Sequence, residues 1–434
     1  MKRSVLVTSL AVIGCTSGSS VNSPGKLVPQ GPSRDSLAIT TAAKGDSAAL
    51  ARLVATSCNG AEKSACYESM LAAPASRGYV KVAMGALNDL GAKDPEVKRT
   101  GHVYAHAIGI AAGTGQSDIA KTFTQCSESF QSGCYHGVIQ ARFAGLDSLS
   151  AKDANDLCAP FRQHESDRWI RFQCVHGMGH GLTMLYDHDL PKGLAGCDLL
   201  TDWWDQHSCY SGAFMENIVN VTMPHHPASA LAHHHDDMAG MDHDMAGMDH
   251  DAKKFKPVDS TNQLYPCSIM SERYLSACYE MQTSVMLYNN KGDIAGAAKS
   301  CESAPTAMRT ICFASLGRDV SSYSQQNHAE AIRICSLAVT KYQPWCYYGL
   351  VKNFIDLEAR SQDGMSLCRE VPSSESKAVC YQAVGEQILV LRSTDADRRA
   401  ACSSAEPEYL DACLYGARLA QVPMILSKVW AGVR

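Results

Sequence analysis

The sequence predicts an all-α fold, a right-handed α-solenoid of about ten helical hairpins with a period of about 34 residues. Three observations lead to this prediction. Cysteines recur at regular intervals, apolar residues between them repeat with the period of a helix, and turn residues separate the apolar stretches. Most hairpins are expected to contain one disulfide.

The cysteines set the period. Of the 19 in the chain, Cys15 stands apart and eighteen form nine neighbouring pairs. The later members of the last five pairs, at 278, 312, 346, 380 and 413, are spaced by 34, 34, 34 and 33 residues. No CxxC occurs, which argues against a zinc ribbon. The expected disulfides are Cys58–Cys66, Cys126–Cys134, Cys158–Cys174, Cys197–Cys209, Cys267–Cys278, Cys301–Cys312, Cys335–Cys346, Cys368–Cys380 and Cys402–Cys413.

Each period reads as two helices. Residues 328–339 predict a short first helix, and residues 345–359 predict a longer second helix. In the second helix the apolar residues Cys346, Tyr347, Leu350 and Phe354 share one face. Each disulfide then joins the end of the first helix to the start of the second, which contributes roughly 3 kcal/mol in the chain-entropy model. Period and cysteine pairing together resemble cysteine-rich helical-hairpin repeat proteins related to the tetratricopeptide class.

The N-terminus predicts export. Lys2 and Arg3 precede an apolar run over 5–13, and Ile13-Gly14-Cys15 resembles the lipobox of bacterial lipoproteins. That resemblance implies a signal peptide over 1–14, lipidation of Cys15 and, because residue 16 is not aspartate, a place on the periplasmic side of the outer membrane. The alternative is an ordinary cleaved secretory signal. Residues 15–47 are rich in Ser, Gly, Pro and Thr and predict a flexible tether.

Composition limits the partners. The formal net charge is −5 and no basic patch occurs, which argues against nucleic acid. The expected partners are the membrane, through the lipid, and a protein along the solenoid surface.

Histidines recur in register within the repeats over 48–222. Extrapolating the period places second-helix reference positions at 100, 134, 174 and 209. Two residues further lie His102, His136, His176 and Ser211, and six residues further lie His106, Gln140, His180 and Met215. On a helical wheel these positions lie about 200–240° from the cysteine, opposite the apolar face. We therefore expect the histidines to line a surface or groove, the alternative being core histidines bonded to the backbone.

This pattern predicts a metal site. Histidines four residues apart on a helix can share one ion, as in HVYAH (102–106) and HGMGH (176–180). His136 is expected between the two pairs, in one shared site or beside two separate ones. Glu216 is a candidate ligand or general base, and YDHD (186–189) is expected to reach the rim. The glycines in HGMGH predict close approach of a neighbouring helix or a ligand.

A second metal signal lies in an insertion over 223–262, which separates the first five repeats from repeats six to ten over 263–434. It contains the duplicated heptapeptide MAGMDHD. Thioether and imidazole together suit copper, with zinc or nickel as alternatives. It resembles the His/Met-rich loops of periplasmic copper-handling proteins, although it also reads as a solvated acidic spacer. Its candidate ligands are His233, His234, His235, Met238, Met241, His243, Met245, Met248 and His250.

Three functions follow from these patterns. The first is a lipid-anchored, copper-binding protein of the cell envelope. The second is a metal-dependent hydrolase or oxidase that uses the same histidines, although HExxH, GxSxG and phosphate-binding motifs are absent. The third is a protein-interaction scaffold without metal chemistry.

Overall fold

The structure is a computed structural model that describes residues 33–433, except 61, 117, 145, 164–167 and 223–254. Several sequence predictions fall outside these residues and stay predictions. They are the signal peptide, Cys15, the tether up to residue 32, and the loop ligands His233, His234, His235, Met238, Met241, His243, Met245, Met248 and His250.

The described residues are helical, without a strand among them. The α-helices are α1 (Arg34–Ala42), α2 (Ser47–Ser57), α3 (Lys63–Ala75), α4 (Val80–Gly91), α5 (Pro95–Gly113), α6 (Ile119–Phe123), α7 (Gly133–Gln140), α8 (Ala151–Leu157), α9 (Arg168–Leu185), α10 (Leu190–Cys197), α11 (Trp203–Thr222), α12 (Glu272–Tyr279), α13 (Gln282–Asn289), α14 (Ile294–Glu302), α15 (Thr306–Tyr323), α16 (His328–Cys335), α17 (Gln343–Asp356), α18 (Ser361–Glu370), α19 (Ser374–Leu391), α20 (Asp395–Cys402), α21 (Leu410–Gly416) and α22 (Met424–Ala431). Short 3₁₀ helices are η1 (Ala159–Arg162), η4 (Cys267–Ile269), η5 (Thr340–Tyr342) and η6 (Pro407–Tyr409).

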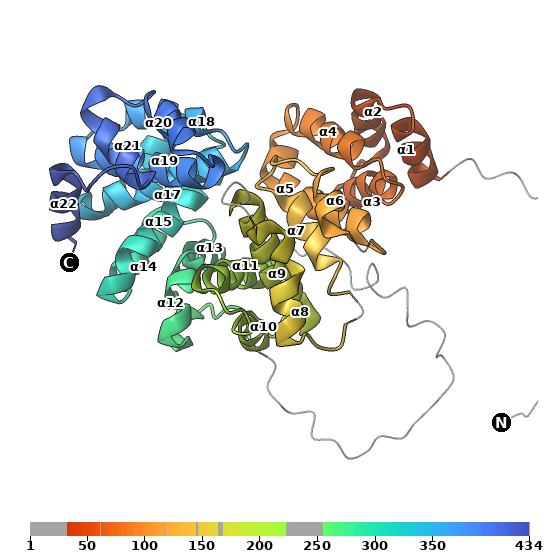
Figure 1. Ribbon diagram of the computed structural model, residues 1–434, viewed down its shortest axis with the longest axis horizontal. Helices are drawn as coiled ribbons and strands as arrows, with labels where there is room; N and C mark the ends of the chain where they lie inside the picture. Colours follow the sequence, from red (N-terminus) through yellow and green to blue (C-terminus); the bar gives the residue numbers. More distant parts are fainter. Residues whose placement is uncertain are drawn as a thin grey trace, which may run out of the picture. The chain divides into compact units, whose positions relative to one another are not determined.

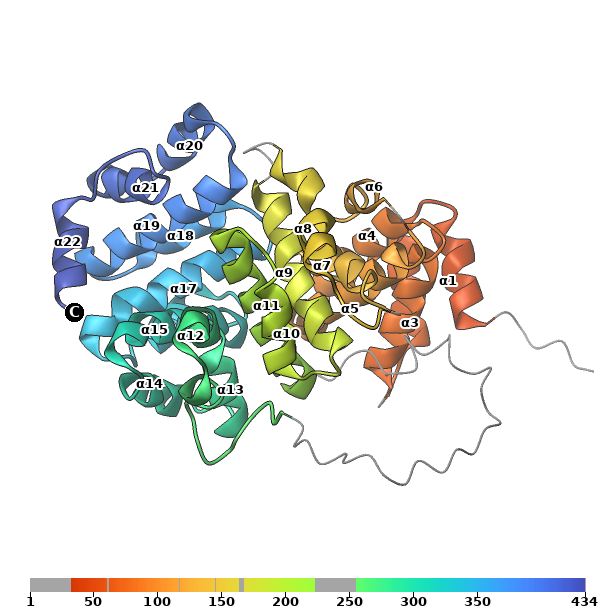
Figure 2. The same cartoon turned by 60° about the horizontal axis from the view of Figure 1, so that its bottom comes forward.

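Successive helices form hairpins, and each hairpin packs on the next (Figures 1 and 2). The second helices of the hairpins contact one another in chain order, so that α5 packs on α7, α7 on α9 and α9 on α11. The same succession continues through α15, α17, α19 and α21. The prediction of an all-α stack of hairpins is confirmed.

The nine disulfides pair the cysteines as their spacing predicts. Cys335 ends α16 and bonds Cys346 in the first turn of α17, and both are fully buried. The widest pair, Cys158–Cys174, accommodates its 16-residue separation because η1 lies between α8 and α9. Each disulfide thus holds the two helices of one hairpin together.

Local sequence explains where the helices begin. Many start after a residue whose side chain accepts a bond from a free N–H of the first turn. These capping residues are Asp46, Asp94, Asp118, Ser150, Asp189, Asp293, Asn327, Ser373 and Thr394. The expected apolar face is also present, since Cys346, Tyr347, Leu350 and Phe354 are at most 5% exposed.

Two expected boundaries are wrong. The segment 15–47 was predicted to be a flexible tether, but α1 lies within it, with Ala38 and Ala42 buried against α3. The insertion was predicted to extend to 262, but Phe255 and Val258 pack against the core. The Pro257 carbonyl also accepts a bond from Asn217 Nδ2. In both segments a few apolar side chains among polar ones suffice for packing.

No helix in the described part of the chain combines the length and the apolar character needed to span a bilayer.

Candidate metal centre

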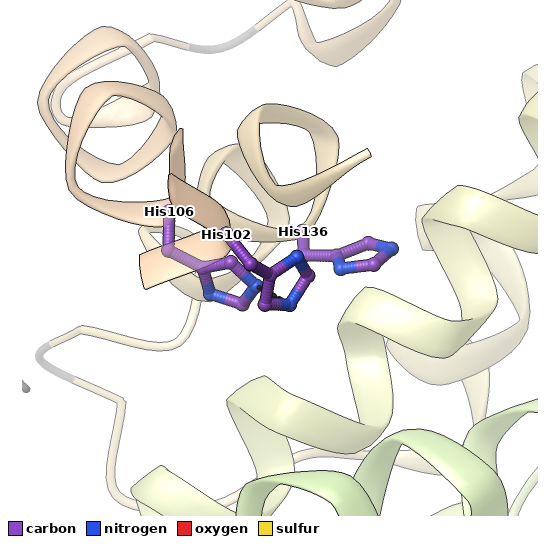
Figure 3. A group of neighbouring side chains, drawn as sticks. All are labelled: His102, His106 and His136. Carbon is purple, nitrogen blue, oxygen red and sulfur yellow. Dashed lines mark hydrogen bonds between the residues drawn. The ribbon is translucent and has the colours of Figure 1, made fainter. Parts of the chain in front are cut away.

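Five histidines meet where α5, α7 and α9 pack together. His102 and His106 come from α5, His136 from α7, and His176 and His180 from α9. Figure 3 shows His102 and His106 side by side, with His136 next to them. The ring centroids of His106 and His180 are 5.1 Å apart, so the two i, i+4 pairs meet directly as well as through His136.

The histidines are buried, which corrects the expectation of a surface or groove. His106, His136, His176 and His180 are 1–4% exposed, and His102 is partly buried. A helical wheel of one second helix shows only which face points away from the core of its own hairpin. In the stack, that face is covered by the second helices of the neighbouring hairpins.

Glycines bring these helices together. A Cβ at Gly179 would lie 2.0 Å from the carbonyl oxygen of Cys209, and one at Gly137 would lie 2.2 Å from that of His106. Three glycines cost α9 roughly 1 kcal/mol each in helix propensity relative to alanine. The close approach they permit places imidazoles from three helices within contact distance.

The structure also corrects the register of the second hairpin. Gly179 lies five residues after the reference position Cys174 and packs on the Cys209 carbonyl of the next second helix. Gly109 packs on the Cys134 carbonyl in the same way. The reference position of the second hairpin is therefore Tyr104, not residue 100. Tyr104 lies 38 residues after Cys66 and 30 residues before Cys134, not midway between them. His106, His136 and His176 are thus equivalent, with His102 one turn before this row and His180 one turn after it.

The hydrogen-bond acceptors beside His102 and His106 determine which ring nitrogen of each carries the hydrogen. His102 Nδ1 lies 2.8 Å from the Phe130 carbonyl oxygen, which can only accept, so Nδ1–H donates. His106 Nδ1 lies 2.8 Å from Gln140 Oε1 and donates likewise. The remaining Nε2 atoms face each other at 3.0 Å (Figure 3). In neutral rings both atoms are acceptors, so a separation of 3.0 Å fits a shared proton between them, whereas an ion bound in line by both nitrogens needs them about 4 Å apart.

The other three histidines follow the same rule. His136 Nε2 donates to Gln173 Oε1 at 2.8 Å, and its buried Nδ1 has no hydrogen-bond partner among the described residues. His176 Nδ1 donates to Ser211 Oγ at 2.9 Å. The Ser211 hydroxyl in turn donates to the Ser208 carbonyl.

His180 completes the set. Its Nδ1 donates to Glu216 Oε2 at 2.8 Å, and its buried Nε2 also has no hydrogen-bond partner among the described residues. Buried polar atoms without partners are uncommon in folded proteins, and a bound ion or water is one explanation for them.

Glu216 lies behind the cluster. Its Oε2 accepts a hydrogen bond from His180 Nδ1 and, at 3.3 Å, a second from Gln140 Nε2. The bond to Nε2 fixes the Gln140 amide so that its Oε1 faces His106. One carboxylate therefore orients histidines of both pairs. The expected rim segment 186–189 contributes His188, whose Nδ1 lies 3.9 Å from Glu216 Oε1.

Among the described residues, the five histidines form two groups of possible ligands. One is His102, His106 and His136, and the other is His136, His176 and His180. Within each group the candidate atoms lie within 4.8 Å of one another. Imidazoles bound to one tetrahedral ion at about 2.0–2.1 Å are about 3.3 Å apart, so small side-chain shifts would close either group around an ion.

Burial keeps two of these rings neutral. It is the largest cause that lowers the pKa of His136 well below 6.5, followed by the neighbouring His176 and His180. Burial and then His180 lower the pKa of His176 in the same direction. Neutral imidazole is the form that binds metal.

Sequence reasoning missed two partners of the histidines. Gln173 lies three residues before His176 and carries no motif. The Phe130 carbonyl is presented by three consecutive residues with left-handed backbone, Phe130, Gln131 and Ser132, at φ of 56°, 54° and 63°. Such a run is uncommon outside glycine, and nothing in these residue types indicates it.

Two other features lie apart from the cluster. A cavity of about 640 Å³ is lined by residues of 118–160 that include Asp118, Arg142 and Phe143 but none of the five histidines. In the C-terminal repeats, Tyr348 and Lys352 are half-buried and bond Glu386.

No family model, curated protein or solved structure matches this chain. The resemblances to lipoproteins and to tetratricopeptide-like repeats therefore stay predictions.

Proposed function

We propose that this chain is a lipid-anchored protein of the bacterial cell envelope that binds a transition metal, copper in the native state, in its buried histidine cluster. The observation that carries the proposal is the common orientation of five imidazoles. Each donates one ring N–H to an outer acceptor and turns its other nitrogen toward its neighbours. Histidines that bind metal have this arrangement, in which the outer bond fixes the ring and raises the basicity of the ligating nitrogen.

Copper is preferred because of the chemistry of the ligands. A site made of imidazoles alone suits copper, zinc and nickel, and copper has the highest affinity in the divalent series. The insertion adds thioethers, which select Cu(I). In this proposal the insertion collects copper from the periplasm and the cluster holds it more tightly. The N-terminal lipobox supports the location.

The test measures metal in the full chain, exported to the periplasm and purified without chelator. A loop-replaced chain has serine at the seven histidines and five methionines between 223 and 251. A cluster variant carries H176Q and H180Q, and a matched control carries H328Q, outside the cluster, where His328 pairs with Glu370. Elemental analysis gives the bound metal, and circular dichroism verifies folding.

We expect copper in the wild-type, H328Q and loop-replaced chains, and less copper in the cluster variant. Copper that is lost only with the loop ligands would refute a site in the cluster. No metal in any chain would refute metal binding and leave the interaction scaffold. Location is tested separately, because C15S should move the chain from the membrane fraction to the soluble fraction.

A further inference from the structure

We propose that Cu(I) moves between solvent and the buried cluster along the C-terminal end of α9, where Met184 and His188 bind it in passing. The inference rests on the proposed function, because it assumes that the cluster binds copper, and it adds the route by which the ion enters and leaves. Each step exchanges one ligand for another without a change of oxidation state.

Four side chains on α9 and in the turn after it follow one another at intervals of four residues. They are His176, His180, Met184 and His188. Residues four apart share one face of a helix and lie about 6 Å apart along its axis. His176 and His180 are buried, Met184 is half-buried, and the side chain of His188 is 30% exposed. This ladder therefore leads from the cluster to the surface.

The end of α9 fixes the backbone of His188. The helix ends at Leu185, and Asp187 and His188 have left-handed backbone, with φ of 52° and 59°. The His188 N–H donates to the Thr183 carbonyl at 2.8 Å, and the Asp187 N–H donates to that of Met184 at 3.0 Å. These are the two bonds of a Schellman motif. They hold an outer histidine one step beyond Met184.

Glu216 on α11 lies beside this ladder, and its two carboxylate oxygens face different histidines of it. Oε2 accepts a hydrogen bond from His180 Nδ1 at 2.8 Å, and Oε1 lies 3.9 Å from His188 Nδ1. The Met184 sulfur and Glu216 Oε2 both accept from Nε2 of Gln140, at 3.0 and 3.3 Å. Thioether, imidazole and carboxylate therefore meet at the outer side of the cluster.

One nitrogen of His188 remains for a ligand. Its Nδ1 is buried and has no hydrogen-bond partner in the part of the chain that the structure describes, because 3.9 Å exceeds the length of a hydrogen bond. Such an atom calls for an explanation, and an ion bound there supplies one. Glu216 is 2% exposed, and its negative charge offsets the cost of taking a cation out of water.

The ligand types favour Cu(I). Thioethers select Cu(I), whereas zinc binds cysteine, histidine and carboxylate ligands. The side chain of methionine is unbranched and flexible, so Met184 can follow an ion from His188 toward His180. Removal of its sulfur should therefore slow Cu(I) and leave Zn(II) unaffected.

A residue on the route differs from a ligand of the bound ion in its effect on kinetics. Loss of a ligand from the bound state weakens the equilibrium affinity. Loss of a residue that binds the ion only in passing slows loading and release by the same factor, so that Kd stays the same.

The experiment measures loading and release rates in the loop-replaced full chain, so that the insertion does not contribute. The metal-free chain is mixed with Cu(I) on a chromogenic chelator under anaerobic conditions with excess reductant, and release is followed after addition of a tighter chelator. Zn(II) is measured in the same way, and equilibrium competition gives Kd. The variants are M184L and H188Q. Their matched controls are M308L, since Met308 is also half-buried but lies on α15, and H328Q, since His328 pairs with Glu370.

We expect M184L to slow both loading and release of Cu(I) about 10-fold, equivalent to about 1.4 kcal/mol on the barrier, with Kd and the Zn(II) rates unchanged. H188Q should slow both metals, and both controls should match the parent. Unchanged Cu(I) rates in M184L or H188Q, equal slowing of Zn(II) and Cu(I) in M184L, or a weakened Kd in M184L would overturn the inference and leave the proposed function standing. A loop-replaced parent that binds no copper would overturn both.

Discussion

Glu216 orients the histidines of the cluster by hydrogen bonds. It reaches His180 directly and His106 through Gln140, and these bonds hold imidazoles of two helices in place. The sequence identified Glu216 by its register beside the histidines, as a candidate ligand or general base. In the structure its bonds run to Nδ1 of His180 and to the Gln140 amide, which makes it an orienting group behind the imidazoles.

The first prediction at this scale concerns E216Q. Glutamine keeps the size of the side chain and an acceptor for His180, but it removes the negative charge beside the cluster. Loss of such an outer partner typically lowers metal affinity about 10–100-fold, and we expect a fall in this range with little change in fold. Chelator competition on the loop-replaced chain measures it. E370Q, which alters the His328–Glu370 pair away from the cluster, should leave the affinity unchanged. Equal affinities for E216Q and the loop-replaced parent would contradict the role of Glu216.

The second prediction concerns pH in the metal-free chain. The pKa values of His136 and His176 are lowered by burial, so the unfolded chain binds protons that the folded chain does not. Stability is therefore fully present above about pH 6.5 and falls as the pH decreases below it, by about 1.4 kcal/mol per pH unit for each histidine. Urea unfolding at pH 7.5, 6.5 and 5.5 measures this loss. H176Q should make the dependence shallower, and a slope unchanged by H176Q would refute the assignment.

At the scale of the element, the close contact between second helices determines which residues can lie on them. Gly179 on α9 and Gly317 on α15 hold equivalent positions, five residues after the reference cysteine. A Cβ there would lie 2.0 Å and 1.8 Å, respectively, from a backbone carbonyl oxygen of the next second helix. Because backbone cannot rotate away as a side chain can, the two helices must separate if a methyl group is added.

G179A and G317A form a matched pair. Each should lower the free energy of unfolding by about 1–3 kcal/mol through overpacking. Only G179A should weaken metal binding, because it moves α9 relative to α11 and so shifts His180 from Glu216. Thermal unfolding gives the stabilities, and chelator competition gives the affinities. Metal binding reduced equally in both variants would mean that global destabilisation, not local geometry, controls the site.

At the scale of the whole molecule, regular features were predictable and irregular ones were not. The cysteine period predicted the hairpins and the disulfide pairs, because each hairpin repeats one local solution. The register of the second hairpin was not predictable, since it lacks cysteines and only the combined length of two repeats was known. The burial of His136 depends on α5 and α9, which are remote in sequence from α7. The partner carbonyl of Phe130 depends on a backbone conformation that its residue types do not indicate.

A repeat array also predicts where metal stabilises the chain. Each hairpin contacts its neighbours, so the stability of an array is approximately a sum of local contributions. Metal that binds the folded cluster should stabilise α5, α7 and α9 by about 2.7 kcal/mol at a free concentration a hundredfold above Kd. Hydrogen exchange of the loop-replaced chain with Zn(II), which is redox-inert, should then slow about 100-fold in these helices.

Helices α20, α21 and α22, several hairpins away along the chain, should exchange at the same rate with and without Zn(II). A chain that carries H102Q, H106Q, H176Q and H180Q keeps neither group of ligands and should show no slowing in α5 and α7 under the same conditions, which excludes weak binding at surface carboxylates. Slowing spread evenly over both halves of the chain would show that the hairpins unfold as one cooperative unit. In that case the metal would stabilise the whole protein from three of its helices, and the nearest-neighbour description would be wrong.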